Sequence, residues 1–313
     1  MRSHPDNQIV NSVVFSGVEE LEEAAQALGW HIQYRQISKG DFRAEFASLE
    51  CNGISLVSER FNNHLYIPCE PPEGFVGLFL PRLAVGSSVA CGRALTKGSL
   101  IVFPPSSELE FVNRGEIRNE TLFLAEGDFQ AASRALAPSE ALISSRSTTI
   151  LDGDPERFAA ICHEIDSVFR NGGLNRETAW NLLAETILFM ADASSSSSAE
   201  RLANGAAAAI AHRAQTFIEE RFRDVIRMQD LCAFTGVGLR KLQRCFSSHF
   251  QVSPIAYIKA RRLNAARRDL VDADPSSHTV TWIATENGFS HLGRFSVDYR
   301  AHFGESPSET LAR

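Results

Sequence analysis

The last third of the chain contains an internal repeat, in which similar residues return after 52 or 53 positions. Self-similarity over such a distance indicates that the chain uses one structural unit twice. In order, Leu231, Cys232, Gly236, Leu242, Phe246, Phe250, Ser253 and Pro254 correspond to Ile283, Ala284, Gly288, Phe295, Tyr299, Phe303, Ser306 and Pro307.

Each copy of the repeat predicts a helix-turn-helix unit. A short helix (228–234 and 280–286) ends at a turn with a glycine, and in the following helix apolar residues recur every four positions. One such unit would also fit a plain helical bundle, but two in register favour paired DNA readers. The helix predicted between them, 254–271, would fix their separation, which must be roughly 34 Å if both are to engage one face of one duplex.

Charge is distributed unevenly along the chain. The net charge is −7, yet residues 213–313 carry 15 Lys and Arg against 11 Asp and Glu. Such a basic region is typical of a partner with a phosphate backbone, although a solvated helix face would also be basic. Within it, eight basic residues come before the next acidic one, Asp269: Arg240, Lys241, Arg244, Lys259, Arg261, Arg262, Arg267 and Arg268.

The composition is that of a globular protein. A chain of 313 residues with 44% hydrophobic content suits two domains. We expect a cytoplasmic protein without a membrane span, because the chain has no uncharged apolar run of about 18 residues and no signal-peptide core. The six cysteines are dispersed and form no C-x-x-C pair, which predicts reduced thiols rather than disulfides or a zinc ribbon.

The first two thirds of the chain predict β structure followed by helices. Residues 9–30 have helical spacing that ends at Gly29. Residues 31–125 are punctuated by prolines and glycines, which predicts a compact β sandwich or small barrel of short strands. The predicted strand segments are 53–58, 74–80, 99–102, 109–112 and 120–124.

Two amphipathic helices, 155–170 and 176–192, follow the predicted strands. Their apolar stripes exceed what a small barrel needs, so we expect this region to form a homodimer. The serine run 194–198 has nothing to bury and predicts a linker. The predicted organisation is an α+β protein of two domains: a regulatory and dimerisation domain (1–193), a serine-rich linker (194–205) and an all-helical DNA-binding domain (206–313).

The repeat and the helix between its copies contain the motifs Asp230-Leu-Cys232, Leu242-Gln-Arg-Cys-Phe246, Arg262-Leu-Asn-Ala-Ala-Arg267, Gly288-Phe289 and Phe303-Gly-Glu-Ser-Pro307. With these motifs, residues 213–313 resemble the AraC/XylS family of transcription regulators. They are most similar to the branch that holds the ethanolamine-operon activator, without implying ethanolamine or cobalamin here. The resemblance implies a cupin-like or jelly-roll domain with dimerisation helices in residues 1–193. It also implies double-stranded DNA, RNA polymerase and a small-molecule effector as partners.

Helical geometry selects the residues that would contact DNA. The buried faces are expected to hold Leu239, Leu242, Phe246 and Phe250 in the first unit and Leu292, Phe295, Tyr299 and Phe303 in the second. The predicted base-reading residues are Arg240, Gln243, Arg244, His291 and Arg294. The predicted DNA-backbone contacts are Lys241, Ser290, Arg261, Arg262, Arg267 and Arg300.

The two readers are not equivalent in the sequence. Arginine suits bidentate contact with guanine and glutamine with adenine, and the resemblance also implies base contacts at Arg240, Gln243 and Arg244. The second helix instead offers Gly293 and Val297, which have no polar group, at comparable exposed positions. The sequence leaves two roles open for Ser290, His291 and Arg294, which could hold the DNA backbone or reach one or two bases. The first unit is therefore predicted to carry most of the sequence specificity.

A cupin-type metalloenzyme with a helical protein-interaction tail is the alternative from another class. Such a metal site needs clustered histidines and carboxylates on facing strands, whereas residues 31–125 contain only His31 and His64. The chain also has no nucleophile elbow, P-loop or dinucleotide fingerprint. We therefore expect no catalytic residues, no metal ligands and no cofactor.

The sequence does not name an effector. Arg114 and Arg118 form an R-x-x-x-R pattern that resembles the first half of the PilZ signature for cyclic dinucleotides. The second half is absent, and the same residues fit an ordinary hairpin turn. A small apolar or amphiphilic molecule inside the barrel is the default expectation. The chain is thus predicted to be a sequence-specific transcription regulator, an activator, controlled by a small ligand.

Overall fold

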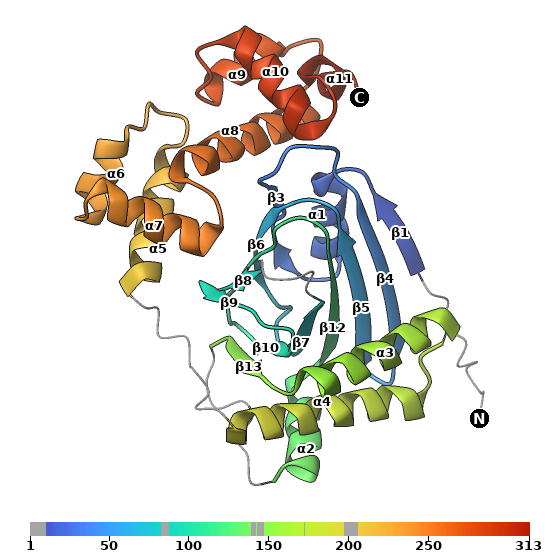
Figure 1. Ribbon diagram of the computed structural model, residues 1–313. Coiled ribbons are helices and arrows are strands. Elements are labelled where there is room, and N and C mark those ends of the chain that lie inside the picture. Colours follow the sequence, from blue (N-terminus) through green and yellow to red (C-terminus); the bar gives the residue numbers. More distant parts are fainter. Residues whose placement is uncertain (1–10, 83–87, 139–141, 143–146, 172, 197–205) are drawn as a thin grey trace.

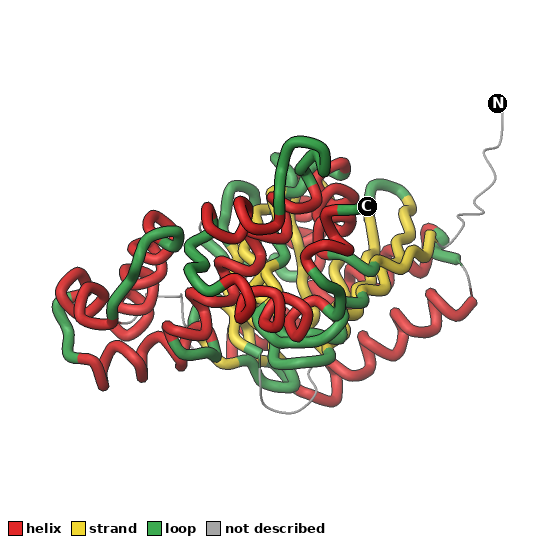
Figure 2. Tube along the Cα trace, turned by 90° about the horizontal axis from the view of Figure 1, so that it is seen from above, coloured by secondary structure: helices red, strands yellow, loops and turns green. Residues whose placement is uncertain are grey.

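The protein consists of a β-rich domain with helical cover and an all-helical domain (Figure 1). The structure is a computed structural model that describes residues 11–82, 88–138, 142, 147–171, 173–196 and 206–313. In both views the helical domain lies against the β-rich domain, and its two halves are joined by one long helix (Figures 1 and 2).

Two antiparallel sheets form the β-rich domain. One has the strand order β1-β4-β5-β12-β7-β10-β13, and the other has the order β2-β6-β11-β8-β9, with β3 also paired to β6. The first contains β1 (Asn11–Phe15), β4 (Ala44–Cys51), β5 (Ile54–Phe61), β7 (Phe75–Arg82), β10 (Ser99–Phe103), β12 (Ile117–Ala125) and β13 (Thr149–Asp152). The second contains β2 (His31–Ile32), β3 (Arg35–Gln36), β6 (Leu65–Glu70), β8 (Val89–Ala90), β9 (Arg93–Ala94) and β11 (Leu109–Val112).

The five predicted strand segments are confirmed as parts of β5, β7, β10, β11 and β12. The expected cupin-like barrel is open, because among the described residues no ladder joins the seven-stranded sheet to the second sheet. Of the two architectures predicted from the sequence, a β sandwich and a small barrel, the structure has the β sandwich.

The seven-stranded sheet is buried on both faces. In β7, Leu78 and Leu80 pack under helices, whereas Phe79 between them faces the core between the two sheets. In β12, Leu122 likewise packs under the helices, and Phe123 faces the core between the two sheets. Because successive side chains point to opposite faces, a sheet covered on both sides reads as an apolar run rather than as an alternation.

Helices cover the outer face of this sheet. These are α2 (Glu126–Leu136), α3 (Pro155–Asn171) and α4 (Arg176–Ser196). The two predicted amphipathic helices are confirmed as α3 and α4, and their apolar residues, such as Ile165 and Ile187, are fully buried within this chain. Trp180 of α4 is 45% exposed. A role of α3 and α4 in dimerisation stays a prediction.

The start of the chain differs from its prediction. Residues 11–15 form β1, paired with β4, and only Val18–Ala27 is helical, as α1. The β-branched and aromatic run Val13-Val-Phe15 favours a strand, and Gly17 in an extended conformation separates it from the helix. The serine run also differs, because α4 continues to Ser196. The rest of the predicted linker, 197–205, lies outside the described residues.

The helical domain follows the predicted repeat. It contains α5 (Ala206–Arg221), α6 (Met228–Thr235), α7 (Leu239–Phe250), α8 (Pro254–Val271), α9 (Val280–Glu286), α10 (Leu292–Phe303) and α11 (Pro307–Leu311). The helices predicted at 228–234, 254–271 and 280–286 are confirmed to within one residue. The first unit packs around Phe246 and the second around Phe295. No helix in the described ranges is long and apolar enough to span a membrane.

Candidate DNA-binding surface

Glycine sets the turn between the two helices of each unit. Gly236 closes α6 in the left-handed conformation with φ 71°, and Gly288 follows α9 with φ 78°. Other residue types rarely adopt such a backbone. A Cβ at Gly288 would also lie 2.6 Å from the carbonyl oxygen of Arg223, so the turn has no room for a side chain.

The first recognition helix, α7, has a buried and an exposed face as predicted. Leu242, Phe246 and Phe250 are at most 1% exposed. Leu239 is the exception, because at 46% exposure it lies outside the core at the first position of the helix. The side chains predicted to contact DNA are all exposed and lie on this one helix: Arg240, Lys241, Gln243 and Arg244.

The second recognition helix, α10, presents a poorer polar surface. Phe295 and Tyr299 are buried, whereas Leu292, predicted to be buried, is 38% exposed at the first position of the helix. Val297 is 68% exposed and occupies the centre of the outward face. The predicted contacts His291, Ser290, Arg294 and Arg300 are all exposed.

Three arginines predicted to hold the DNA backbone use their donors within the protein. Arg261 Nε lies 2.8 Å from Glu219 Oε2, and its guanidinium stacks 3.9 Å from the ring centre of Phe222. Arg262 donates to the carbonyl oxygens of Phe222, Asp224 and Gly288. These two arginines therefore tie α8 to the loop after α5 and to the turn after α9.

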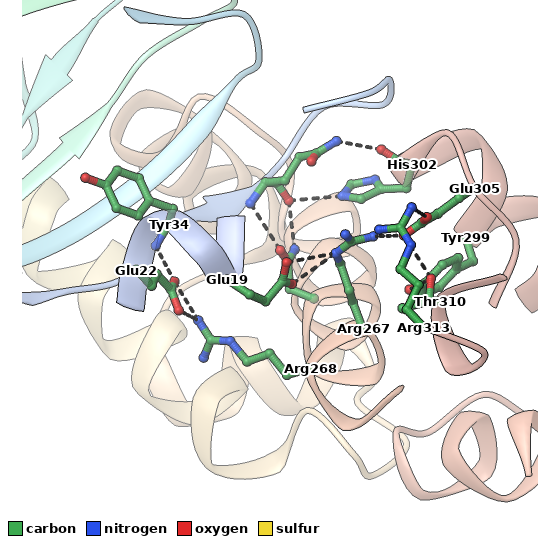
Figure 3. A network of polar contacts seen from close by, with 12 residues as sticks. Glu19, Glu22, Tyr34, Arg267, Arg268, Tyr299, His302, Glu305, Thr310 and Arg313 are labelled. Carbon is green, nitrogen blue, oxygen red and sulfur yellow. Dashed lines mark hydrogen bonds and ion pairs between the residues drawn. The ribbon is translucent and has the colours of Figure 1, made fainter. Parts of the chain in front are cut away.

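Arg267, the third of these arginines, belongs to a polar interface between the domains (Figure 3). Its Nε lies 3.0 Å from Glu19 Oε1 on α1, and its Nη1 lies 2.7 Å from Glu305 Oε1. The neighbouring Arg268 places Nη2 2.7 Å from Glu22 Oε1, also on α1. This interface was not predictable from the sequence, because no local pattern connects α1 with a helix more than 200 positions away.

A second set of bonds joins β3 to the helical domain. Asn264 Nδ2 donates to the Gln36 carbonyl oxygen (2.8 Å), and Asn264 Oδ1 accepts from the Gln36 amide (3.2 Å). His302 Nε2 lies 3.0 Å from the same carbonyl oxygen. Burial lowers the pKa of His302 to about 4, so the ring is neutral at pH 7 and donates to Gln36.

A small apolar cavity of about 70 Å³ lies between the two sheets. Rings such as Trp30, Phe79 and Phe111 line it, together with the polar side chains of Tyr34, Glu59, Asn119 and Thr121. Tyr34 donates to Glu59 (3.0 Å), but burial raises the pKa of this carboxyl to about 7. The Asn119 Oδ1 atom is buried without a hydrogen-bond partner among the described residues.

The other sequence candidates lie apart from this cavity. Arg118 pairs with Glu120 (2.7 Å) and Asp166 (2.6 Å), while Arg114 is exposed in the turn before β12. Of the two histidines of the β region, His31 is exposed and His64 is buried with a pKa lowered to about 4, chiefly by burial. Neither belongs to the group of His, Cys, Asp and Glu side chains found close enough together to hold a metal among the described residues.

Comparison with known proteins places the helical repeat in a family. A helix-turn-helix domain family matches residues 231–313. The XylDLEGF operon transcriptional activator of Pseudomonas putida is 38% identical over 99 residues, which are 32% of this chain and 31% of that protein. A probable thc operon regulatory protein of Rhodococcus erythropolis is 37% identical over 102 residues, which are 33% of this chain and 31% of that protein.

The chain thus spans about a third of the length of these curated relatives. Among solved structures, a probable AraC family transcriptional regulator from Rhodopseudomonas palustris is 38% identical, with a TM-score of 0.31. That match covers 34% of this chain and 96% of the other. The matched residues 231–313 include α7 and α10, which carry the predicted readers. The chain therefore carries an AraC-family helix-turn-helix domain at residues 231–313.

Proposed function

We propose that the whole protein is a sequence-specific transcription regulator, an activator, that binds promoter DNA through α7 and α10. The observation that carries this proposal is the exposed polar face of α7, on which Arg240, Gln243 and Arg244 project from a helix held by a buried apolar face. Side chains of these types read guanine and adenine in the major groove. The operon activators among the relatives support the same function.

The connecting helix has a suitable length for two readers on one duplex. An α8 of 18 residues is about 27 Å long, and the units at its two ends extend beyond it. This is of the order of the roughly 34 Å repeat of DNA. We propose that Lys241, Ser290 and Arg300, which are exposed, supply backbone contacts, while Arg261 and Arg262 keep α8 rigid.

We propose that a small effector acts on the cavity between the sheets. The cavity favours a largely apolar molecule with a hydrogen-bond donor, because its lining is mostly apolar and the buried Asn119 Oδ1 acceptor has no partner among the described residues. Its volume is far below the roughly 300–1,000 Å³ of ordinary ligand sites, so a ligand must push the surrounding elements apart. One of these elements is α1, which lines the cavity with Ala25 and places Glu19 at the domain interface; Leu28, directly after α1, also lines the cavity.

We propose that the protein acts in the cytoplasm as a homodimer through α3 and α4, recruits RNA polymerase, and recognises two similar half-sites. The motif Arg262-Leu-Asn-Ala-Ala-Arg267 supports a place near the branch of the ethanolamine-operon activator. Sedimentation of the full chain at micromolar concentration tests the dimer, and a monomer would contradict it.

Selection of bound duplexes from a random pool by the full chain tests DNA recognition. We expect an enriched motif, with an affinity that falls steeply as salt rises. The Arg240→Ala and Arg244→Ala variants should lose the enrichment, whereas Arg134→Ala, on the exposed surface of α2, should retain it. Failure to enrich any motif at low salt would contradict the proposal.

A further inference from the structure

One cluster of ionisable side chains, outside the proposed DNA-binding and effector sites, spans both domains. It consists of Glu110 in β11, His212 in α5 and His249 in α7. His249 Nε2 lies 3.2 Å and His212 Nε2 lies 3.3 Å from the same atom, Glu110 Oε2. All three potential ligand atoms lie within 4.8 Å of one another.

We propose that these three side chains bind a divalent transition-metal ion of the zinc class between the domains. Zinc takes histidine nitrogen and carboxylate oxygen in tetrahedral geometry at about 2.0–2.2 Å, which puts neighbouring ligand atoms roughly 3.3 Å apart. The two separations from Glu110 Oε2 match that spacing. Three protein ligands leave the fourth position for water.

Neighbouring groups hold these ligands in orientation. Tyr66 donates to Glu110 Oε1 (2.5 Å) and accepts from Gln215 (2.7 Å), so the other carboxylate oxygen faces the histidines. Partners of this kind orient the ligands of protein metal sites. His249 is 96% buried at its side chain, and its Nδ1 has no partner among the described residues, so Nε2 is its polar link to the cluster.

The absence of a side chain at Gly92 leaves room for the buried His249 ring. A Cβ at Gly92, which follows β8, would lie 2.5 Å from His249 Nδ1. The ring of His212 packs edge-on against that of His249, with 4.4 Å between the ring centres. Two imidazoles are thus brought to one carboxylate from different helices and held there by packing.

An acidic cleft borders the carboxylate of the cluster. Glu110 lines an interdomain cleft of about 410 Å³, whose wall also carries Glu70 and Glu108. The basic residue in this wall, Arg35, is itself paired with Glu219 at 2.6 Å. The negative charge of the cleft would attract a cation.

A bound ion would connect β11 to the last turn of α7, the helix that carries the proposed base readers. Metal occupancy would therefore limit the movement of α7 relative to the β-rich domain. This consequence for DNA binding rests on the proposed function, whereas metal binding itself does not.

Calorimetric titration of the chelator-treated full chain with Zn²⁺ tests the site. We expect one equivalent to bind, and Co²⁺ in its place to give the visible absorption bands of a tetrahedral site. The variants Glu110→Gln and His212→Ala should bind at least about tenfold more weakly. The matched control is His163→Ala, an exposed histidine on α3, which should bind as the unaltered chain does.

Thermal unfolding without metal establishes that each variant is folded, and His212, which is 31% exposed at its side chain, is the variant least disturbing to the core. Absence of stoichiometric binding, or unchanged affinity in both ligand variants, would overturn the proposal. Unchanged affinity would place the ion elsewhere, as the enzyme alternative requires. Loss of DNA binding with zinc binding intact would count against the proposed function alone.

Discussion

Arg267 and Glu19 form a mostly buried ion pair across the domain boundary, with Nε 3.0 Å from Oε1 (Figure 3). Their side chains are 7% and 16% exposed. The Arg267 guanidinium also stacks 4.9 Å from the ring centre of Phe303 in α10. It therefore contacts residues of both domains. Removal of Glu19 would leave Arg267 paired with Glu305, so we expect a loss of stability below the about 3–5 kcal/mol typical of a buried charge without a partner.

The first prediction is that this pair couples the two domains energetically. A double-mutant cycle with Glu19→Gln and Arg267→Gln should give a coupling free energy of about 0.5–3 kcal/mol, measured by denaturant unfolding of the full chain. The matched control is Arg43 with Glu45, an exposed pair at 3.2 Å, which should give less than about 1 kcal/mol. Equal coupling for both pairs would show that the interface does not hold the domains.

The second prediction concerns the division of labour between the readers. Arg244→Ala and Gln243→Ala should each flatten preference at a single base pair, because a lost bidentate contact costs about 1–3 kcal/mol for the matching base alone. Arg294→Ala should weaken all duplexes alike and lower the salt slope by about one. The Arg294 side chain is 81% exposed, and its ion pair with Asp298 is long, at 3.8 Å. These contacts do not fix the orientation that base reading needs.

Binding to a panel of single-base-pair variants at fixed salt measures both effects. The opposite pattern, in which Arg294→Ala erases preference at one base pair while Arg244→Ala lowers affinity uniformly, would assign base reading to the second unit.

Local patterns predicted the helical domain well, because its helices are amphipathic and end at glycines such as Gly236. Apolar runs also located β7 and β12. They missed β4, β6, β13 and α2, whose short or mixed segments gain their structure from pairing and packing with distant residues. The exposed face of α7 was predictable from its period of four. The burial of Arg267 was not, because its partner Glu19 is brought to it only by the docking of the domains.

The third prediction concerns the cavity carboxyl, Glu59. The pKa of Glu59 is about 7 in the folded protein and 4.5 ordinarily. The folded state therefore loses stability as the pH rises from 4.5 to 7, because the ionised carboxylate is unfavourable in the apolar cavity. Glu59→Gln keeps an acceptor for Tyr34 and removes the charge. We expect the variant to be more stable than the unaltered chain by about 1–3 kcal/mol at pH 8 and nearly equal to it at pH 5.

Denaturant unfolding at the two pH values measures this difference. Asn119→Asp, which adds a second carboxyl to the same cavity, should show the reverse and lose stability at pH 8. A stability gain for Glu59→Gln that is the same at both pH values would contradict ionisation as its cause.

The last prediction is that docking of the second unit weakens in acid through His302. Burial is the main cause of its low pKa of about 4; Lys259 and Lys39 lower it further, while the bond to Gln36 and the charge of Asp298 oppose this. Because the folded-state pKa lies below the ordinary 6.5, the contribution of His302 is complete above about pH 6.5 and is lost as pH falls through 4. The shift corresponds to at most about 3 kcal/mol.

His302→Gln retains a donor for the Gln36 carbonyl but does not titrate, so its unfolding free energy should fall less between pH 7 and pH 4 than that of the unaltered chain. His163→Gln on the exposed face of α3 should leave the pH profile unchanged, and identical profiles for His302→Gln and the unaltered chain would show that this buried ring does not set the acid sensitivity of the interface.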